Sequence, residues 1–328
     1  MDSDMQTSPS PKTSRDRRAT SPLSVTRHGW WSILWRVYGS IQKHHIGMMA
    51  SSIAFYGLLS LFPAIAALIS IWGMYADPVQ VQQQLVNLDQ FIPTEAASII
   101  EHQAEVVTAS AGRGLNLTAI GSLLFTLYSA SKSVQSFTEG LNIIYGEKEQ
   151  RHFLAQIVIN IVLTLGMILL AIFMLFSVAI LPVVMNFFPF ADTLTTSLYY
   201  LRWLIMLCII TLGIAVLYRF GPNRRAPRWE WLSIGTITST LLWILGSLGF
   251  SLYVSHFGSY NSTYGSIGAV VVLLMWFWLS AYIILLGASI NCELERTTEK
   301  DTTTGTPKPM GQRHAYAADT VAKDSNDI

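Results

Sequence analysis

The chain has 328 residues, of which 51% are hydrophobic and 12% are charged, and its net charge is +1. Ordinary soluble domains have about a quarter of their residues charged, so this composition excludes a typical soluble protein and indicates a membrane protein. The two cysteines, Cys208 and Cys292, lie outside the predicted outward-facing loops. We therefore expect no disulfide framework.

The first 29 residues contain no continuous apolar run, which argues against a cleavable signal peptide, and their Ser, Pro and Arg content predicts a disordered tail. From Trp30 to Ile41 apolar residues recur at helical spacing, with Trp31, Trp35 and Tyr38 beside them. This pattern is typical of a helix that lies in the membrane interface, where aromatic rings suit the headgroup level. An ordinary packed helix at the edge of a bundle would show the same pattern.

Six stretches are long and apolar enough to cross a bilayer, because about 20 residues at about 1.5 Å each span a hydrocarbon core of about 30 Å. In lipid the backbone polar groups must find partners within the segment, so we expect helices and an all-α fold. One membrane domain over residues 30–296 would precede a second disordered tail over residues 297–328. The predicted spans are residues 49–75, 115–135, 153–181, 198–220, 231–257 and 267–291.

The positions of the basic residues predict the orientation. Of the 21 Lys and Arg residues, all except Arg113 and Arg202 lie before the first span, after the sixth span, in the segment of residues 132–152 or around the loop GPNRRAPR. Lys and Arg concentrate on the cytoplasmic side of membrane proteins. Both termini are therefore predicted to be cytoplasmic, in agreement with an even number of spans.

Four separated blocks of sequence carry a family resemblance. They read SSIAFYGLLSLFPAIAALIS, YSASKSVQSFTEGLNIIYGEKEQRHF, YRFGPNRRAPRWEW and YGSIGAVVVLLMWFWLSAYIILLGASINCELER. In this order they resemble the YihY/BrkB family, whose members have been labelled ribonuclease BN-like or virulence factor BrkB. The resemblance covers roughly residues 30–296 and implies a six-helix protein of the bacterial inner membrane.

The ribonuclease label finds little support in the residues. A nuclease needs carboxylates or histidines that hold a metal ion, or His and Lys residues placed for acid and base catalysis. The seven histidines are scattered, and no HExxH, zinc-spaced cysteine pair or P-loop occurs. Glu101, His102 and Glu105 are close in sequence, but they are predicted to lie outside the cytoplasm, where a solvated helix face is the simpler interpretation. We expect no enzyme activity, catalytic residue, metal, cofactor or nucleic-acid partner.

Polar residues at membrane depth are costly, so they are the default candidates for function. They either line a pathway or hold helices together. Pro63 also removes a backbone hydrogen bond from the first span and predicts a kink, and Lys132 lies near the predicted inner boundary, where its ammonium could reach water. The candidates are Tyr56, Ser60 and Pro63 in the first span, Tyr128, Lys132, Gln135, Glu139 and Asn142 along one face of the second helix, and Asn291 and Glu295 in the sixth.

The loop GPNRRAPR supplies candidate contacts to lipid headgroups. Arg224, Arg225 and Arg228 are predicted to stand at the cytoplasmic surface, where each basic residue contributes about 1 kcal/mol of attraction to anionic lipid. Membrane lipids, including anionic headgroups, are therefore the expected partners.

Three functions fit these observations. A transporter or translocator of lipid or another envelope component would use the interrupted first helix and the polar face of the second as a pathway. A non-catalytic scaffold, or an envelope-integrity factor, would use the same residues to pack helices and bind partners. A membrane-associated ribonuclease would need a site that the sequence does not reveal.

Overall fold

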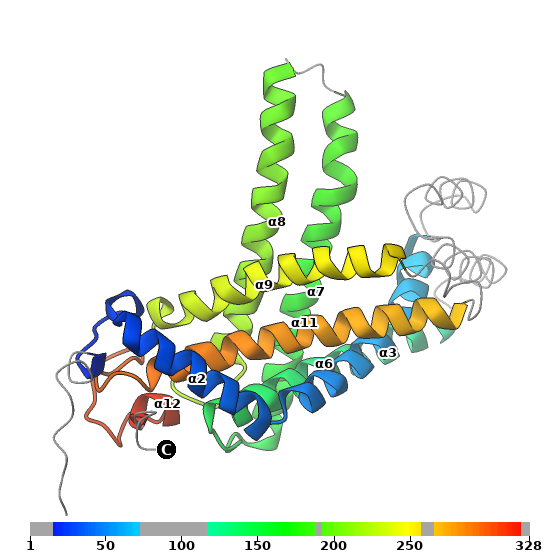
Figure 1. Ribbon diagram of the computed structural model, residues 1–328. Coiled ribbons are helices and arrows are strands. Elements are labelled where there is room, and N and C mark those ends of the chain that lie inside the picture. Colours follow the sequence, from blue (N-terminus) through cyan, green and yellow to red (C-terminus); the bar gives the residue numbers. More distant parts are fainter. Residues whose placement is uncertain (1–15, 73–116, 188–191, 257–265, 323–328) are drawn as a thin grey trace, which may run out of the picture. The chain divides into compact units, whose positions relative to one another are not determined.

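The computed structural model describes residues 16–72, 117–187, 192–256 and 266–322, and every named element in this part of the chain is a helix (Figure 1). The predicted all-α class is confirmed for these residues. The elements are η1 (Pro22–Ser24), α2 (Arg27–Lys43), α3 (Ile46–Trp72), α6 (Leu117–Tyr145), α7 (Phe153–Phe187), α8 (Asp192–Phe220), α9 (Trp229–His256), α11 (Ser266–Glu295) and α12 (Tyr316–Asp319).

Each predicted span coincides with one of the long helices α3, α6, α7, α8, α9 and α11. Within the described residues, four helices contain stretches long and apolar enough to cross a membrane: Phe153–Met174, Trp203–Phe220, Trp229–Val254 and Val270–Glu295. The helix α3 adds a shorter apolar stretch, Ile46–Leu61. Six spans and the orientation of the termini therefore stay predictions.

The described residues form two compact units. The α7–α8 unit comprises residues 16–49, 137–187, 192–244 and 282–322, and the α3–α6 unit comprises residues 50–72, 117–136, 245–256 and 266–281. In the first unit α7 and α8 pack along each other (Figure 1).

The helix α2 belongs to the α7–α8 unit and buries one face there. Ile33 and Val37 of α2 join Ile290 and Leu294 of α11 and Val25 of the preceding segment in one hydrophobic cluster. The spacing of the two α2 residues places them on one side of the helix. The apolar periodicity that predicted a helix from residue 30 thus also fixes how α2 packs.

The N-terminal segment is folded from residue 16, which corrects the prediction of a disordered tail over residues 1–29 for its last part. The carboxylate of Asp16 accepts hydrogen bonds of 2.8 Å from both the N–H and the hydroxyl of Thr26. The Thr26 hydroxyl in turn accepts a hydrogen bond from the N–H of Gly29 and caps α2. Residues 1–15 lie outside the described residues.

Two glycines let α9 and α11 approach each other closely. A Cβ atom on either Gly235 or Gly287 would overlap the carbonyl oxygen of the other glycine. Beside this contact, Asn291 accepts a hydrogen bond of 2.8 Å from the N–H of Gly235, and the hydroxyls of Tyr218 and Ser239 lie 2.8 Å apart. Small residues and interhelical hydrogen bonds hold these helices together.

The C-terminal segment is also folded, as far as residue 322, which corrects the prediction of a disordered tail over residues 297–328. The Arg313 side chain is buried and donates hydrogen bonds to four backbone carbonyls. One guanidinium thus connects the beginning and the end of the C-terminal segment. Thr303 forms an isolated antiparallel bridge with Pro227 of the α8–α9 loop. Polar composition suggested disorder, but buried hydrogen bonds to charged groups order this segment.

Candidate functional site

A polar stripe on α6 contains three of the predicted site residues. The ammonium of Lys132 donates a hydrogen bond of 3.0 Å to the side-chain oxygen of Gln135 and lies 5.8 Å from the centroid of the Tyr128 ring. Tyr128 is 57% exposed, whereas Lys132 and Gln135 are half-buried. Among the described residues, no carboxylate lies within ion-pair distance of Lys132. The stripe is therefore a cation held by a neutral amide and an aromatic face.

The same side of α6 is apolar toward its start. Leu124 precedes Tyr128 by one helical turn and is 61% exposed, and the neighbouring Phe125 is 45% exposed. The rings of Phe125 and Tyr128 lie 6.5 Å apart. The α6 face thus changes from apolar to aromatic to cationic along its length, and we call Leu124, Phe125, Tyr128, Lys132 and Gln135 the α6 stripe.

Hydroxyl groups join α3 to α6 within the α3–α6 unit. Ser133 donates a hydrogen bond of 3.2 Å to the carbonyl of Ile53, and the hydroxyls of Ser52 and Ser136 lie 3.1 Å apart. Gly57 of α3 faces this contact, because a Cβ there would meet Ser133. The polar residues between these two helices therefore serve packing.

Two of the predicted residues of α3 interact with residues of their own helix. Ser60 donates a hydrogen bond of 2.8 Å to the carbonyl of Gly57 within its own helix, and the Tyr56 ring makes an edge contact with Phe55. Pro63 lies inside α3, and the helix continues through it to Trp72.

Asn142 lies apart from the α6 stripe, in the α7–α8 unit, where it holds a loop. Its side-chain oxygen accepts a hydrogen bond of 2.7 Å from the N–H of Asn223, and its amide donates to Glu149. Glu149 forms two hydrogen bonds with the Arg151 guanidinium, each 2.8 Å long. Burial raises the pKa of Glu149, but the bonds from Arg151 and Asn142 outweigh it and hold this pKa below its ordinary value. Glu139, one helical turn earlier, is exposed.

A buried ion pair joins the α8–α9 loop to the end of α11. Arg224 donates a hydrogen bond of 2.6 Å to the carboxylate of Glu295, and both side chains are 0% exposed. The other carboxylate oxygen accepts a hydrogen bond from Thr302 of the C-terminal segment. The guanidinium also lies 4.2 Å from the centroid of the Tyr145 ring. This arrangement ties together the ends of α6 and α11, the loop and the C-terminal segment.

This burial corrects the prediction that Arg224 contacts lipid headgroups. The C-terminal segment lies against the Arg224–Glu295 pair through Thr302, and the Arg224 side chain is fully buried. Arg225 and Arg228 donate hydrogen bonds to the carbonyls of Thr306 and Thr303 in that segment. Arg228 is exposed, and the contact of these two residues with lipid headgroups stays a prediction.

Sequence reasoning missed the partners that order this end of the α7–α8 unit. Glu293 of α11 pairs with Arg36 of α2 at 2.8 Å, and Glu147 accepts a hydrogen bond from the N–H of Tyr316. Burial raises the pKa of Glu147, although the N–H of Tyr316 and the charge of Arg224 act to lower it. The sequence CELER indicated that Glu293 would need a partner, because it places two acids at the end of a long apolar helix.

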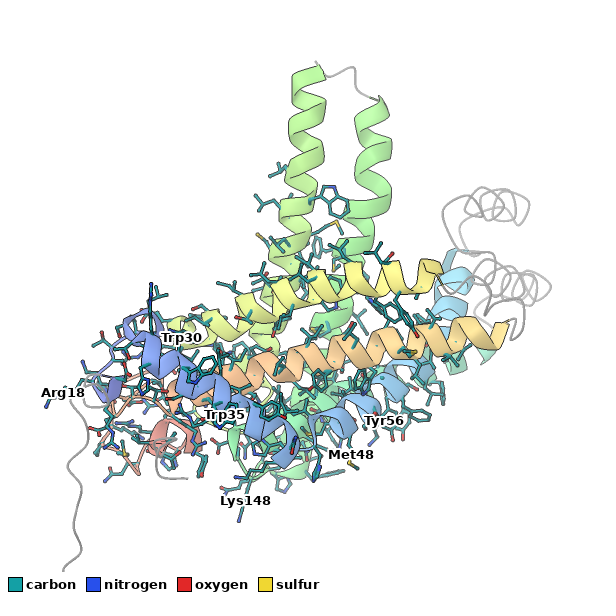
Figure 2. All side chains as sticks on the ribbon, in the orientation of Figure 1. Arg18, Trp30, Trp35, Met48, Tyr56 and Lys148 are labelled. Atoms are coloured by element: carbon teal, nitrogen blue, oxygen red, sulfur yellow. The ribbon has the colours of Figure 1, made fainter. Side chains whose placement is uncertain are left out.

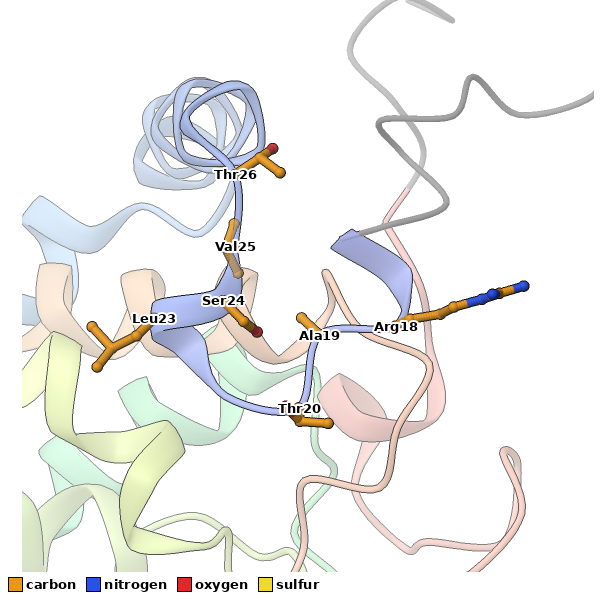
Figure 3. Close-up of a pocket in the computed structure, with 7 residues that line it drawn as sticks. All are labelled: Arg18, Ala19, Thr20, Leu23, Ser24, Val25 and Thr26. Atoms are coloured by element: carbon orange, nitrogen blue, oxygen red, sulfur yellow. The ribbon is translucent and has the colours of Figure 1, made fainter.

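No group of three metal-ligating side chains occurs in the part of the chain that the structure describes. A depression of about 710 Å³ lies along residues 18–26 of the N-terminal segment (Figure 3). The side chains of Arg18 and Leu23 extend away from each other there (Figure 3), and Leu23 is 86% exposed. Diverging side chains do not make a ligand site, so the α6 stripe and the Arg224–Glu295 cluster are the candidates.

The outer surface of the long helices is apolar. Large side chains of α7 such as Leu165, Leu169 and Phe173 are more than half exposed, as expected where lipid is the solvent. Together with four helices able to cross a bilayer, this surface defines an α-helical integral membrane protein.

Comparison with known proteins identifies the family. The model of the family described as virulence factor BrkB matches residues 37–311, so the chain belongs to the BrkB family, and the resemblance seen in the sequence is confirmed. A Bacillus subtilis protein named as ribonuclease-like, YfkH, is 29% identical over 81% of this chain and 96% of its own length. A UPF0761 membrane protein of Cronobacter sakazakii is 29% identical over 84% of this chain and 91% of its own length. A UPF0761 membrane protein of Pseudoalteromonas translucida is 27% identical over 84% and 88%. No solved structure matches the chain.

Proposed function

We propose that this protein moves an anionic amphiphile, such as an acidic phospholipid or an envelope precursor with the same chemistry, between the leaflets of the membrane. The observation that carries the proposal is Lys132, a half-buried cation in the predicted second span with no carboxylate at ion-pair distance among the described residues. Ionisable residues at membrane depth are functional candidates by default.

The α6 stripe has the chemistry that such a substrate requires. Lys132 would bind the anionic headgroup, Gln135 would orient the ammonium, and the exposed Leu124 and Phe125 would contact the acyl chains. An ammonium is a flexible point charge, which suits a headgroup that must bind and leave. The gradient from apolar to cationic side chains would align the substrate along α6.

The hydroxyl of Ser129 is a second polar group that supports a substrate path along α6. The hydroxyl of Ser129 is buried and has no hydrogen-bond partner among the described residues. Buried polar groups normally have partners, so an unsatisfied hydroxyl one turn before Ser133 marks a place where a substrate or water would complete the contacts.

A scaffold is the second candidate, because the polar residues between α9 and α11 are satisfied by each other. Asn291 bonds to Gly235 and to the carbonyl of Leu232, and Tyr218 bonds to Ser239. These groups need no substrate. The two candidates differ in whether the folded protein moves lipid.

Lipid movement in vesicles tests the proposal. The full chain is reconstituted into liposomes that contain a trace of phosphatidylglycerol with a fluorescent label on its headgroup, or the matching labelled phosphatidylcholine, and dithionite is added to bleach the outer leaflet. We expect bleaching of the phosphatidylglycerol label to continue beyond the outer leaflet and to exceed that of phosphatidylcholine. If both labels keep the protection seen in protein-free vesicles while the protein remains folded, the scaffold is favoured. RNA cleavage by protein free of soluble nucleases would favour the enzyme.

A further inference from the structure

One face of α2 is exposed and aromatic, although the opposite face is packed. Trp31, Leu34, Trp35 and Tyr38 are 67%, 51%, 62% and 58% exposed. Their spacing of three, one and three residues places them on one side of the helix. The rings of Trp35 and Tyr38 stack with centroids 5.9 Å apart. Figure 2 shows the side chains of α2, with Trp30 and Trp35 labelled.

The charges around this face have a single sign. The helix RHGWWSILWRVYGSIQK contains no acidic residue. Arg27 is exposed and lies one turn before Trp31, and Lys43 is exposed at the other end of the helix. Two acids lie beside α2, and both already have partners: the Asp16 carboxylate accepts hydrogen bonds from Thr26, and Glu293 is paired with Arg36 at the packed face. An anionic surface would therefore meet no repulsion from α2.

The chain places α2 directly before the first predicted span. α2 ends at Lys43 and α3 begins at Ile46, so the two residues between them can span only about 10 Å. The stretch Ile46–Leu61 is apolar. The predicted first span begins at residue 49, so the C-terminal end of α2 lies close to the predicted entry of α3 into the bilayer.

The packed face fixes α2 rigidly to α11. Arg36 bonds to Glu293 at 2.8 Å, and the hydroxyls of Ser289 and Ser40 lie 3.1 Å apart. These contacts add to the hydrophobic cluster between the two helices. The aromatic face is therefore held in one direction by the protein itself.

We infer that the aromatic face of α2 binds the anionic surface of the membrane. The partner is a lipid surface, because Trp and Tyr suit the headgroup level, exposed Arg27 and Lys43 match anionic headgroups, and α3 adjoins α2. The contact anchors the end of α11 at a fixed depth. This inference is independent of lipid movement along α6.

Spin labels on the full chain test the inference. In a Cys208→Ser background, where the remaining Cys292 is buried, Leu34→Cys and Tyr38→Cys report the α2 face, and Leu23→Cys reports an exposed position before the helix. Accessibility to oxygen, which partitions into lipid, is compared with accessibility to a water-soluble nickel complex in vesicles of phosphatidylcholine and phosphatidylglycerol. We expect the oxygen-to-nickel ratio at positions 34 and 38 to be several-fold higher than at position 23.

Two outcomes overturn the inference. Equal ratios at the three positions would show that water covers the face, and labels at 34 and 38 that are immobile and inaccessible to both reagents would show that protein covers it. The charge contribution is tested with Arg27→Gln and with vesicles of phosphatidylcholine alone. Both changes should lower the ratio at position 34, and an unchanged ratio in both would contradict anionic recognition.

Discussion

The guanidinium of Arg224 and the carboxylate of Glu295 form a 2.6 Å ion pair in which both side chains are fully buried. Loss of one partner leaves an uncompensated buried charge, which typically costs about 3–5 kcal/mol. We predict that Arg224→Met lowers the free energy of unfolding by this order, as measured by thermal unfolding in detergent. Arg224→Met combined with Glu295→Leu should recover part of the loss.

The pair between Arg17 and Glu299 provides a matched control. It is 3.7 Å long, and its side chains are 35% and 51% exposed, so Glu299→Gln should cost less than about 1 kcal/mol. If Arg224→Met were as mild as this control, the Arg224–Glu295 cluster would not hold the end of the unit together.

The close approach of α9 and α11 predicts a large effect of one methyl group. In Gly287→Ala the new Cβ would collide with the hydroxyl of Ser239 and the carbonyl of Gly235, and overpacking of this kind typically costs about 1–3 kcal/mol. Gly249→Ala in α9 meets no atom within 4 Å and should stabilise the helix by about 0.5–1 kcal/mol. Thermal unfolding of the two variants checks this difference, and equal melting temperatures would contradict the packing.

His44, between α2 and α3, predicts a pH dependence of stability. Burial lowers the pKa of His44, and the charge of Lys43 adds to this effect. As the pH falls through the ordinary histidine pKa of about 6.5, the unfolded chain binds a proton more readily than the folded chain, so stability falls. The melting temperature should therefore drop between about pH 7.5 and about pH 5.5. His44→Gln should show a smaller drop, and an equal drop in both proteins would assign the effect to other groups.

The hydrogen bonds of Arg313 are expected to keep the C-terminal segment folded. Its side chain bonds to four carbonyls and is 4% exposed. Arg313→Met would leave these carbonyls without donors, so limited proteolysis should cut the segment after residue 297 faster than in the wild type. Lys300→Met changes an exposed side chain and serves as the control. Equal cutting rates in the two variants would contradict this account of the segment.

The sequence predicted the long helices because a membrane-spanning helix is recognised by the length of its apolar run, which is a local property of the sequence. It also offered a helix contact as one of two uses of Asn291, since amide side chains in an apolar helix can form hydrogen bonds across helices. Both terminal segments were predicted wrongly where the structure describes them. Their order comes from contacts between residues far apart, such as Arg225 with Thr306 and Thr298 with Arg17, and composition carries no signal of such pairs.

The candidate site was predicted only in part. A helical period grouped Tyr128, Lys132 and Asn142 on one face of α6, and the first two do lie together. Asn142 holds the Asn223 backbone instead, because α6 continues past the predicted boundary into the other unit. Helical periodicity predicts on which face of a helix a residue lies. It does not predict which neighbouring segment packs against that face.

The role of Lys132 is the most direct test of the proposed function. Headgroup-labelled phosphatidylglycerol is followed in liposomes that contain the wild type, Lys132→Met, Lys132→Arg or Lys148→Met, the last being a change at an exposed loop residue. We predict that Lys132→Met abolishes the movement of the anionic lipid, that Lys132→Arg keeps most of it, and that Lys148→Met matches the wild type, with equal melting temperatures in all four proteins. Movement by a folded Lys132→Met protein at the wild-type rate would contradict the proposal.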